Sequence, residues 1–278
     1  MAILLRRGNP LPGFVPATSL TLIYLSLLVL IPLAAVVLRA AGLSGAEFWR
    51  VITSPEAMAS YRLTFGAAFT AAALNAVFGF IVAWVLVRYS FPLRRVLDAL
   101  IDLPFALPTA VAGIALAALY GSNGWFGKSL AMLGIQVAYT PVGVFIALIF
   151  VGLPFVVRTV QPVIQELETE QEEAAGSLGG TRWQVFRRVI LPALWPAVVT
   201  GFTLALARGI GEYGSVIFIA GNVPGVSQIT PFVIFTRLEE FDYPAASAIA
   251  VTLLAISLLL LLTINGLQQW RARREGRG

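Results

Sequence analysis

The sequence contains no cysteine and no histidine. Without cysteine a chain forms no disulfide and offers no thiolate ligand, and without histidine it has no imidazole for zinc or for general-base catalysis near neutral pH. Disulfide scaffolds, the usual zinc sites and histidine-dependent catalysis are therefore excluded. The absence of cysteine does not identify the cellular compartment.

Charged residues are also scarce. They make up 12% of the 278 residues, while 58% are hydrophobic and the mean hydropathy is +0.86. Because a soluble domain carries about 25% charged residues, this is the composition of a membrane protein. The net charge of +5 would suit nucleic acid, but the basic residues lie in short clusters between apolar runs, which is typical of membrane topology. We therefore expect membrane lipid, and no nucleic acid, as a partner.

Six apolar stretches approach the length of about 20 residues that a membrane-spanning helix needs. The first is longer than the apolar core of a signal peptide, so we expect a retained helix. We predict an all-α, polytopic integral membrane protein with six transmembrane helices. Residues 1–278 would form a single membrane domain with a core at about 60–265. The six expected spans are 18–38, 63–87, 103–120, 141–157, 193–219 and 245–267.

The distribution of basic residues predicts the orientation. With the N-terminus inside, 13 of the 19 basic residues fall in inside segments and 5 in outside segments, while Arg208 lies within the fifth span. Basic residues concentrate on the cytoplasmic side of membrane proteins. Both termini are therefore predicted to be cytoplasmic, together with the long loop between the fourth and fifth spans.

That loop, residues 158–192, is the one strongly charged segment. Glutamates crowd the half that ends with Glu172 and Glu173, and arginines the half that follows Gly179 and Gly180. Paired glycines interrupt helices and accept left-handed backbone angles. Thr181 can cap a second helix, whose apolar residues recur on one face. We predict a helix, a glycine turn and a second short amphipathic helix outside the membrane.

Glu173-Ala174-Ala175 is followed at fixed spacing by Gly179, Val189 and Leu191-Pro192. This pattern resembles the EAA loop of permeases from binding-protein-dependent ABC importers. That family pattern is matched in spacing, with Val189 at a position that is usually isoleucine. The resemblance implies a type I ABC importer permease fold whose cytoplasmic coupling helix, between helices 4 and 5, docks on a separate ATPase subunit. The residues that carry this coupling role are Glu172, Glu173, Ala174, Ala175, Gly179, Leu191 and Pro192.

Further segments are similar to the T-type, or U-type, permease subunits of bacterial sulfate/thiosulfate importers. They begin at Leu103, Gly152, Gly211 and Arg237. The resemblance implies a non-enzymatic subunit of the bacterial inner membrane that imports sulfate or thiosulfate. It also implies a W-type second permease, two ATPase subunits and an external sulfate-binding protein. This chain would bind no cofactor or metal, and ATP would be used by the partner ATPase.

Two sequence matches to nucleotide-binding motifs lack the required context. Gly209–Gly214 fits GxGxxG by letter, but it lies in an expected span without a βαβ unit. Gly127-Lys128-Ser129 resembles the end of a P-loop, but Ser122 occupies the position of the essential first glycine. We therefore expect no ATPase site in this chain.

Arg208 and Glu212 are the two charged residues expected deep within a span. They are spaced i, i+4, so one helical turn can pair them, and Gly209, Gly211 and Tyr213 lie between and beside them. Ionisable residues and interrupted helices within membranes often line substrate paths. Two interpretations stay open: these five residues line the translocation pathway, or the ion pair joins two helices.

Other polar residues have structural interpretations. Asn75 is expected to form an interhelical hydrogen bond, and Asp98 and Asp102 to lie at the interface or to pair with Arg94 or Arg95. Three acidic residues after Arg237 are expected to meet the binding protein or cap the sixth helix: Glu239, Glu240 and Asp242. Two other functions remain open, a homodimeric permease for molybdate or another oxyanion and, with less support, a membrane-embedded enzyme.

Overall fold

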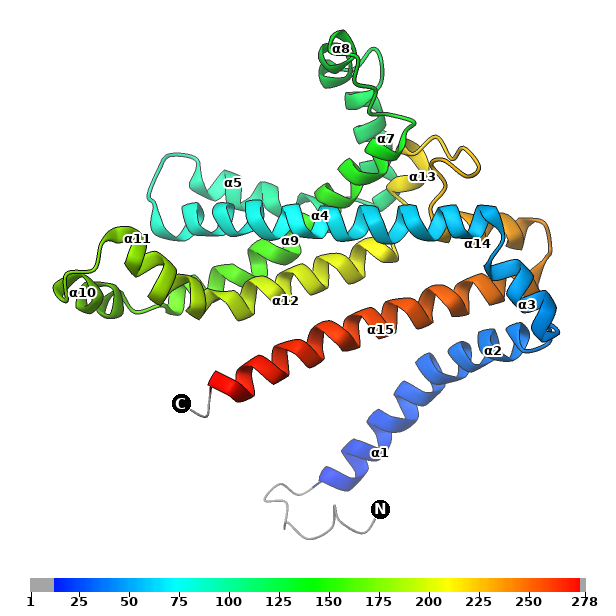
Figure 1. The fold of residues 1–278 in the computed structure, drawn as a ribbon, viewed down its shortest axis with the longest axis horizontal. Coiled ribbons are helices and arrows are strands. Elements are labelled where there is room, and N and C mark those ends of the chain that lie inside the picture. The colour runs from blue at the N-terminus through cyan, green and yellow to red at the C-terminus, as the bar shows by residue number, and fades with distance from the viewer. Residues whose placement is uncertain (1–12, 276–278) are drawn as a thin grey trace.

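The computed structural model describes residues 13–275, with side chains through Trp270, and is helical without any strand in that range (Figure 1). Arg6, Arg7 and Arg277, three of the basic residues predicted to be cytoplasmic, lie outside the described residues. In chain order the elements are α1 (Phe14–Leu25), the π-helical turn η1 (Ser26–Leu30), α2 (Ile31–Ala40), α3 (Gly45–Ile52), α4 (Pro55–Arg88), α5 (Arg94–Ile101), α6 (Leu103–Ala106), α7 (Thr109–Tyr120), α8 (Trp125–Met132), α9 (Pro141–Glu166), α10 (Thr169–Ser177), α11 (Arg182–Val185), the π-helical turn η2 (Phe186–Ile190), α12 (Leu191–Ile210), α13 (Val216–Ile219), α14 (Thr230–Glu239) and α15 (Tyr243–Glu275).

The core is formed by α4, α9 and α12, which pack against one another along much of their length. Small residues on α4 and α12 allow this close approach, as is common between membrane helices. Val156 of α9 lies between two glycines: a Cβ atom on Gly79 of α4 would lie 2.9 Å from its Cβ, and one on Gly201 of α12 would lie 2.8 Å from its Cα. A larger side chain at either glycine would separate the three helices.

Within the described residues, five helices are long and apolar enough to cross a membrane: Phe14–Ala40, Pro55–Arg88, Pro141–Glu166, Arg182–Ile210 and Tyr243–Trp270. The continuous helix predicted over 103–120 is not formed. Leu107 is extended, because the proline at 108 disfavours helical angles in the preceding residue. The remaining helix, α7, has 12 residues, or about 18 Å at 1.5 Å per residue, which is shorter than a hydrocarbon core of about 30 Å.

The fifth predicted span differs at both ends. Helical structure runs without interruption from Arg182 to Ile210, so the expected short amphipathic helix is continuous with the span. The π-helical turn η2 ends two residues before Pro192, and this wider turn accommodates a residue that has no N–H to donate. At the other end the helix stops before Gly211, and 216–219 form the separate helix α13.

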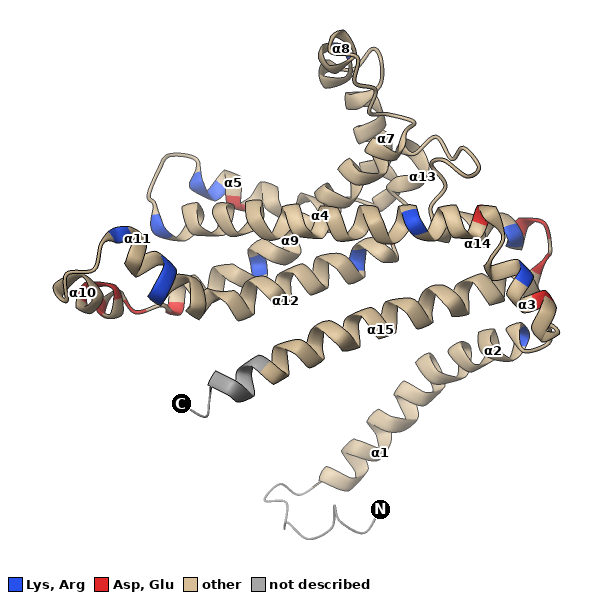
Figure 2. Ribbon diagram, viewed as in Figure 1, with Lys and Arg blue, Asp and Glu red and all other residues tan. Residues whose placement is uncertain are grey.

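The two ends of the long helices carry most of the charge (Figure 2). One end holds α5, α10 and α11, and the opposite end holds α3 and α14. The α1–α2 segment approaches the other helices mainly where α2 contacts α15, and no residue of α1 is buried. The α7–α8 segment projects away from the core at a large angle (Figure 1). The segment that carries α10 is joined to the core by the continuous helix that begins at Arg182.

Candidate coupling loop and polar site

The loop before α12 has the predicted first helix and glycine turn, whereas the second helix is continuous with α12. After α10 the backbone turns at Gly179, whose φ is +85°, and the N–H of Gly180 donates to the carbonyl of Ala175 at 3.1 Å. Glycine is the residue that adopts this left-handed conformation at least cost. Thr181 and Gln184 then form a reciprocal capping box at the start of α11. The predicted glycine turn and Thr181 cap are confirmed.

One side of α10 is held by the core. Glu172 accepts a hydrogen bond from Arg88, at the end of α4, at 2.5 Å, and the Arg88 guanidinium lies 5.1 Å from the ring centroid of Trp84. Arg88 was not among the predicted site residues. It holds α10 beside α4, and in the sequence only its place at an expected span end hinted at this role.

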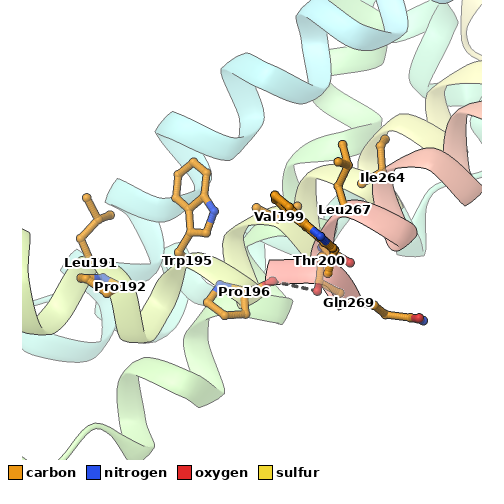
Figure 3. A pocket seen from close by; sticks show the side chains of 11 residues that line it. Leu191, Pro192, Trp195, Pro196, Val199, Thr200, Ile264, Leu267 and Gln269 are labelled. Atoms are coloured by element: carbon orange, nitrogen blue, oxygen red, sulfur yellow. Dashed lines mark hydrogen bonds between the residues drawn. The ribbon is translucent and has the colours of Figure 1, made fainter. Parts of the chain in front are cut away.

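The opposite side of α10 is exposed. Glu173, Ala174 and Gly179 are exposed and Ala175 is half-buried. Leu178 is 90% exposed at the turn, and it was also missed, although an apolar residue between two predicted coupling residues was visible in the sequence. Leu191 and Pro192 are separated from this surface by η2 and begin α12, where they line a groove (Figure 3). The predicted coupling residues therefore occupy two distinct places.

Arg208 and Glu212 form the predicted ion pair. Glu212 is only 1% exposed, and its Oε1 accepts hydrogen bonds from the backbone N–H of Ser215 at 2.9 Å and from its hydroxyl at 2.8 Å. The Arg208 side chain is 34% exposed and lies in the last turn of α12, where the helix dipole favours a cation. A fully buried carboxylate thus faces a partly exposed guanidinium.

The three neighbours of this pair have different surroundings. Gly209 remains helical and packs against α4, where an added Cβ would lie 3.3 Å from that of Ala68. Gly211 follows the end of the helix with open space around it. The ring of Tyr213 packs against that of Phe235 on α14, with the ring centroids 5.5 Å apart and the planes tilted by 43°. The two glycines therefore differ in role: Gly209 allows close helix packing, and Gly211 follows the end of α12.

The breaks in the third and fifth predicted spans meet beside this ion pair. Gly113 of α7 packs directly on the backbone of Ser215: an added Cβ would lie 2.9 Å from its Cα and closer still to its carbonyl oxygen. Gly214 similarly faces the Thr109 side chain at the start of α7. The sequence contained the signals, Pro108 and the glycines, but did not indicate that the two breaks pack together.

Asp98 and Asp102 belong to a second polar cluster, which joins α5 to α9. Arg158 donates to Asp98 Oδ1 at 2.6 Å and to both carboxylate oxygens of Asp102 at 2.8 and 2.6 Å. A hydrogen bond from Gln161, together with the Arg158 guanidinium, lowers the pKa of Asp98 below its usual value. Pairing with Arg94 or Arg95 is therefore not what the structure shows, because Arg158 reaches both carboxylates from the adjacent helix.

Other polar side chains near the helix ends and between helices form local contacts. Asn75 donates a hydrogen bond to the carbonyl of Ile149 on α9 at 3.1 Å, as predicted. Asp242 caps α15 by accepting from Ala245 N–H at 3.2 Å, also as predicted. Glu240 pairs with Arg237 at 2.9 Å. Asn75 thus joins two helices and Asp242 caps one, while Glu240 forms its ion pair within the end of α14.

Comparison with known proteins agrees with this architecture. Residues 75–277 match the family model of the binding-protein-dependent transport system inner membrane component. The chain is 53% identical over 264 residues to the sulfate transport system permease protein CysT of Escherichia coli (strain K12), covering 95% of each chain. It is 52% identical to the protein of that name from Synechocystis sp. (strain ATCC 27184 / PCC 6803 / Kazusa), covering 91% of this chain and 88% of the relative.

Two solved transporters share the fold. One is a bacterial ABC transporter involved in the import of alginate, with a TM-score of 0.71 at 17% identity, covering 92% of this chain and 96% of that one. The other is the MetNI methionine ABC transporter in an inward-facing conformation, with a TM-score of 0.58 at 18% identity, covering 84% and 99%. The all-helical fold is therefore that of an ABC importer permease, and the chain belongs to the family of binding-protein-dependent transport system inner membrane components.

Proposed function

We propose that this chain is a transmembrane permease subunit of an ATP-driven importer of sulfate, with thiosulfate as a second substrate. The observation that carries the substrate is the 53% identity, over 95% of both chains, to a sulfate transport permease. The proposed setting is the bacterial inner membrane, with six spans and both termini in the cytoplasm. The proposed partners are a W-type permease, two ATPase subunits that use ATP, and an external sulfate-binding protein.

The coupling loop supplies the proposed contact with an ATPase. Glu172 holds α10 against Arg88, while Glu173 and Leu178 remain exposed and available to another chain. The helix that begins within this loop, after the glycine turn, runs for 29 residues, from Arg182 to Ile210. At 1.5 Å per residue it is about 43 Å long. A displacement at the ATPase contact would therefore be carried along one continuous helix to Arg208.

The polar site at the far end of that helix is suited to a passing oxyanion. Sulfate is a dianion, and removing its hydration shell is costly unless cations or N–H donors replace the water. The planar guanidinium of Arg208 matches an oxyanion and keeps its charge. Glu212 retains two hydrogen bonds from Ser215 when the guanidinium turns away. We therefore place Arg208 in the translocation pathway, exchanging Glu212 for the anion, with Gly209, Gly211 and Tyr213 around it.

Co-purification tests the assembly. The tagged chain would be captured from its native membrane in mild detergent, and the captured proteins identified by mass spectrometry. We expect an ATPase subunit and a second, different permease. An ATPase with this permease alone would instead support a homodimeric transporter for molybdate or another oxyanion. Capture of no ATPase would contradict the proposal and favour a membrane-embedded enzyme.

A further inference from the structure

An apolar groove of about 800 Å³ lies between the first half of α12 and the end of α15 (Figure 3). A second groove, of about 530 Å³, lies on the other side of α12, against α4. The two grooves share Leu191, Trp195 and Val199, so they flank one ridge of α12. Two adjacent apolar grooves, one on each side of this ridge, are suited in shape to the two acyl chains of a phospholipid.

Two tryptophans in the lining of the first groove indicate its depth in the membrane. Trp195 is 45% exposed and Trp270, across the first groove, is 51% exposed. Tryptophan concentrates where the hydrocarbon meets the headgroups of a membrane. The hydroxyl of Thr200, which also lines the groove, already donates to the carbonyl of Pro196 at 2.8 Å. The lining of the first groove is thus mainly apolar, with Thr200, Gln268 and Gln269 as its polar residues.

Two basic residues come shortly before the α12 residues that line the grooves. Arg187 and Arg188 lie in η2, four and three residues before Leu191, and both are exposed. Neither forms an ion pair or side-chain hydrogen bond with any residue that the structure describes, whereas Arg88, for example, is paired. In the sequence, α15 continues past Trp270 with further basic residues: Arg271, Arg273 and Arg274. The two arginines of η2 therefore place positive charge just before the start of α12.

We propose that this surface binds an anionic phospholipid, with its acyl chains along the two sides of α12 and its phosphate at Arg187 and Arg188. Basic pockets between membrane helices recognise anionic headgroups, and each basic residue near the surface contributes about a fivefold preference. A wholly apolar helix from another protein would fill the slots and leave both arginines without a counter-ion. A free anion would neutralise them and leave the slots empty. A lipid with a charged headgroup meets both requirements.

The proposed lipid site adjoins the segment that is predicted to couple the permease to the ATPase. It lies where the coupling loop joins α12, since Leu191 and Pro192 belong to both the groove and the predicted coupling residues. A bound lipid would contact this junction on its membrane side. Lipid recognition here goes beyond the proposed substrate and partners, and it can be measured without sulfate or ATP.

Brominated lipids provide the test, because bromine quenches tryptophan fluorescence at contact. The purified complex would be placed in phosphatidylcholine vesicles that contain an equal fraction of either brominated phosphatidylglycerol or brominated phosphatidylcholine. The difference between the native complex and a Trp195→Phe complex isolates the Trp195 signal. The variant Arg187→Gln with Arg188→Gln removes the basic pair. Arg94→Gln with Arg95→Gln is the matched control, because it removes the same charge from α5.

We expect brominated phosphatidylglycerol to quench Trp195 more strongly than brominated phosphatidylcholine. That preference should fall about fivefold for each arginine removed at 187 and 188 and persist in the control. Equal quenching by both lipids, or equal loss in the control, would overturn the proposal. No quenching by either lipid would show that a protein subunit covers the groove, and would also overturn it. The single variants Arg187→Gln and Arg188→Gln decide the question should the double variant fail to assemble.

Discussion

Replacing Arg208 by glutamine should destabilise the protein and abolish transport. Glu212 is 1% exposed, and without Arg208 its charge would keep only the two hydrogen bonds from Ser215. Removing one member of a buried ion pair typically costs about 3–5 kcal/mol, because the other charge is left buried without a counter-ion. Partial exposure of Arg208, at 34%, places the expected loss near the lower end, about 3 kcal/mol.

The double variant, Arg208→Gln with Glu212→Gln, separates structure from transport. It leaves no unpaired charge, and the glutamine at 212 can still accept a hydrogen bond from Ser215. We therefore expect most of the lost stability to return, to within about 1 kcal/mol of the native protein. Thermal unfolding of the purified complex in detergent measures this recovery, and co-purification confirms that each variant assembles.

Sulfate uptake by the same two variants then decides the role of Arg208. If the guanidinium replaces hydration around the passing anion, both variants lose uptake even though the double variant is stable. If the ion pair only joins the end of α12 to the following loop, uptake returns together with stability. Recovered uptake in the double variant would refute the pathway assignment.

Three further predictions concern substitutions or reporter fusions made at glycines. Gly179→Arg should leave the complex assembled but separate ATP hydrolysis from uptake, because the residue has φ +85° beside the proposed ATPase contact; unchanged uptake would contradict this role. Reporter fusions should be cytoplasmic at Gly176 and external at Gly124, and an external result at Gly176 would overturn the topology. Gly113→Ala should lower the thermal stability by placing a Cβ against a neighbouring backbone, whereas Gly66→Ala, which has open space around it, should not.

Local features of the fold could be predicted from the sequence. The helix, glycine turn and cap before α12 follow from residues within one segment, from the glutamates to Thr181. The i, i+4 spacing of Arg208 and Glu212 was sufficient to predict their pairing. These predictions succeeded because short-range geometry determines turns, caps and one-turn contacts.

Contacts between distant segments could not be predicted in the same way. Asp98 and Asp102 have arginines close in sequence, yet both pair with Arg158, 56–60 residues further along, because α5 lies beside α9. Likewise, Pro108 disfavours helical angles at Leu107, but the packing of α7 on the loop after α12 depends on the tertiary fold. The sequence thus indicated that these residues could form contacts, but not which distant residues they would contact.

Transport by a reconstituted complex tests the central claim most directly. The permease would be assembled with its co-purified partners in vesicles, and uptake of labelled sulfate measured with and without ATP and the external binding protein. We predict accumulation of sulfate that requires both, with thiosulfate competing more effectively than molybdate. Accumulation of molybdate in preference to sulfate, or no ATP-dependent uptake by an assembled complex, would contradict the account.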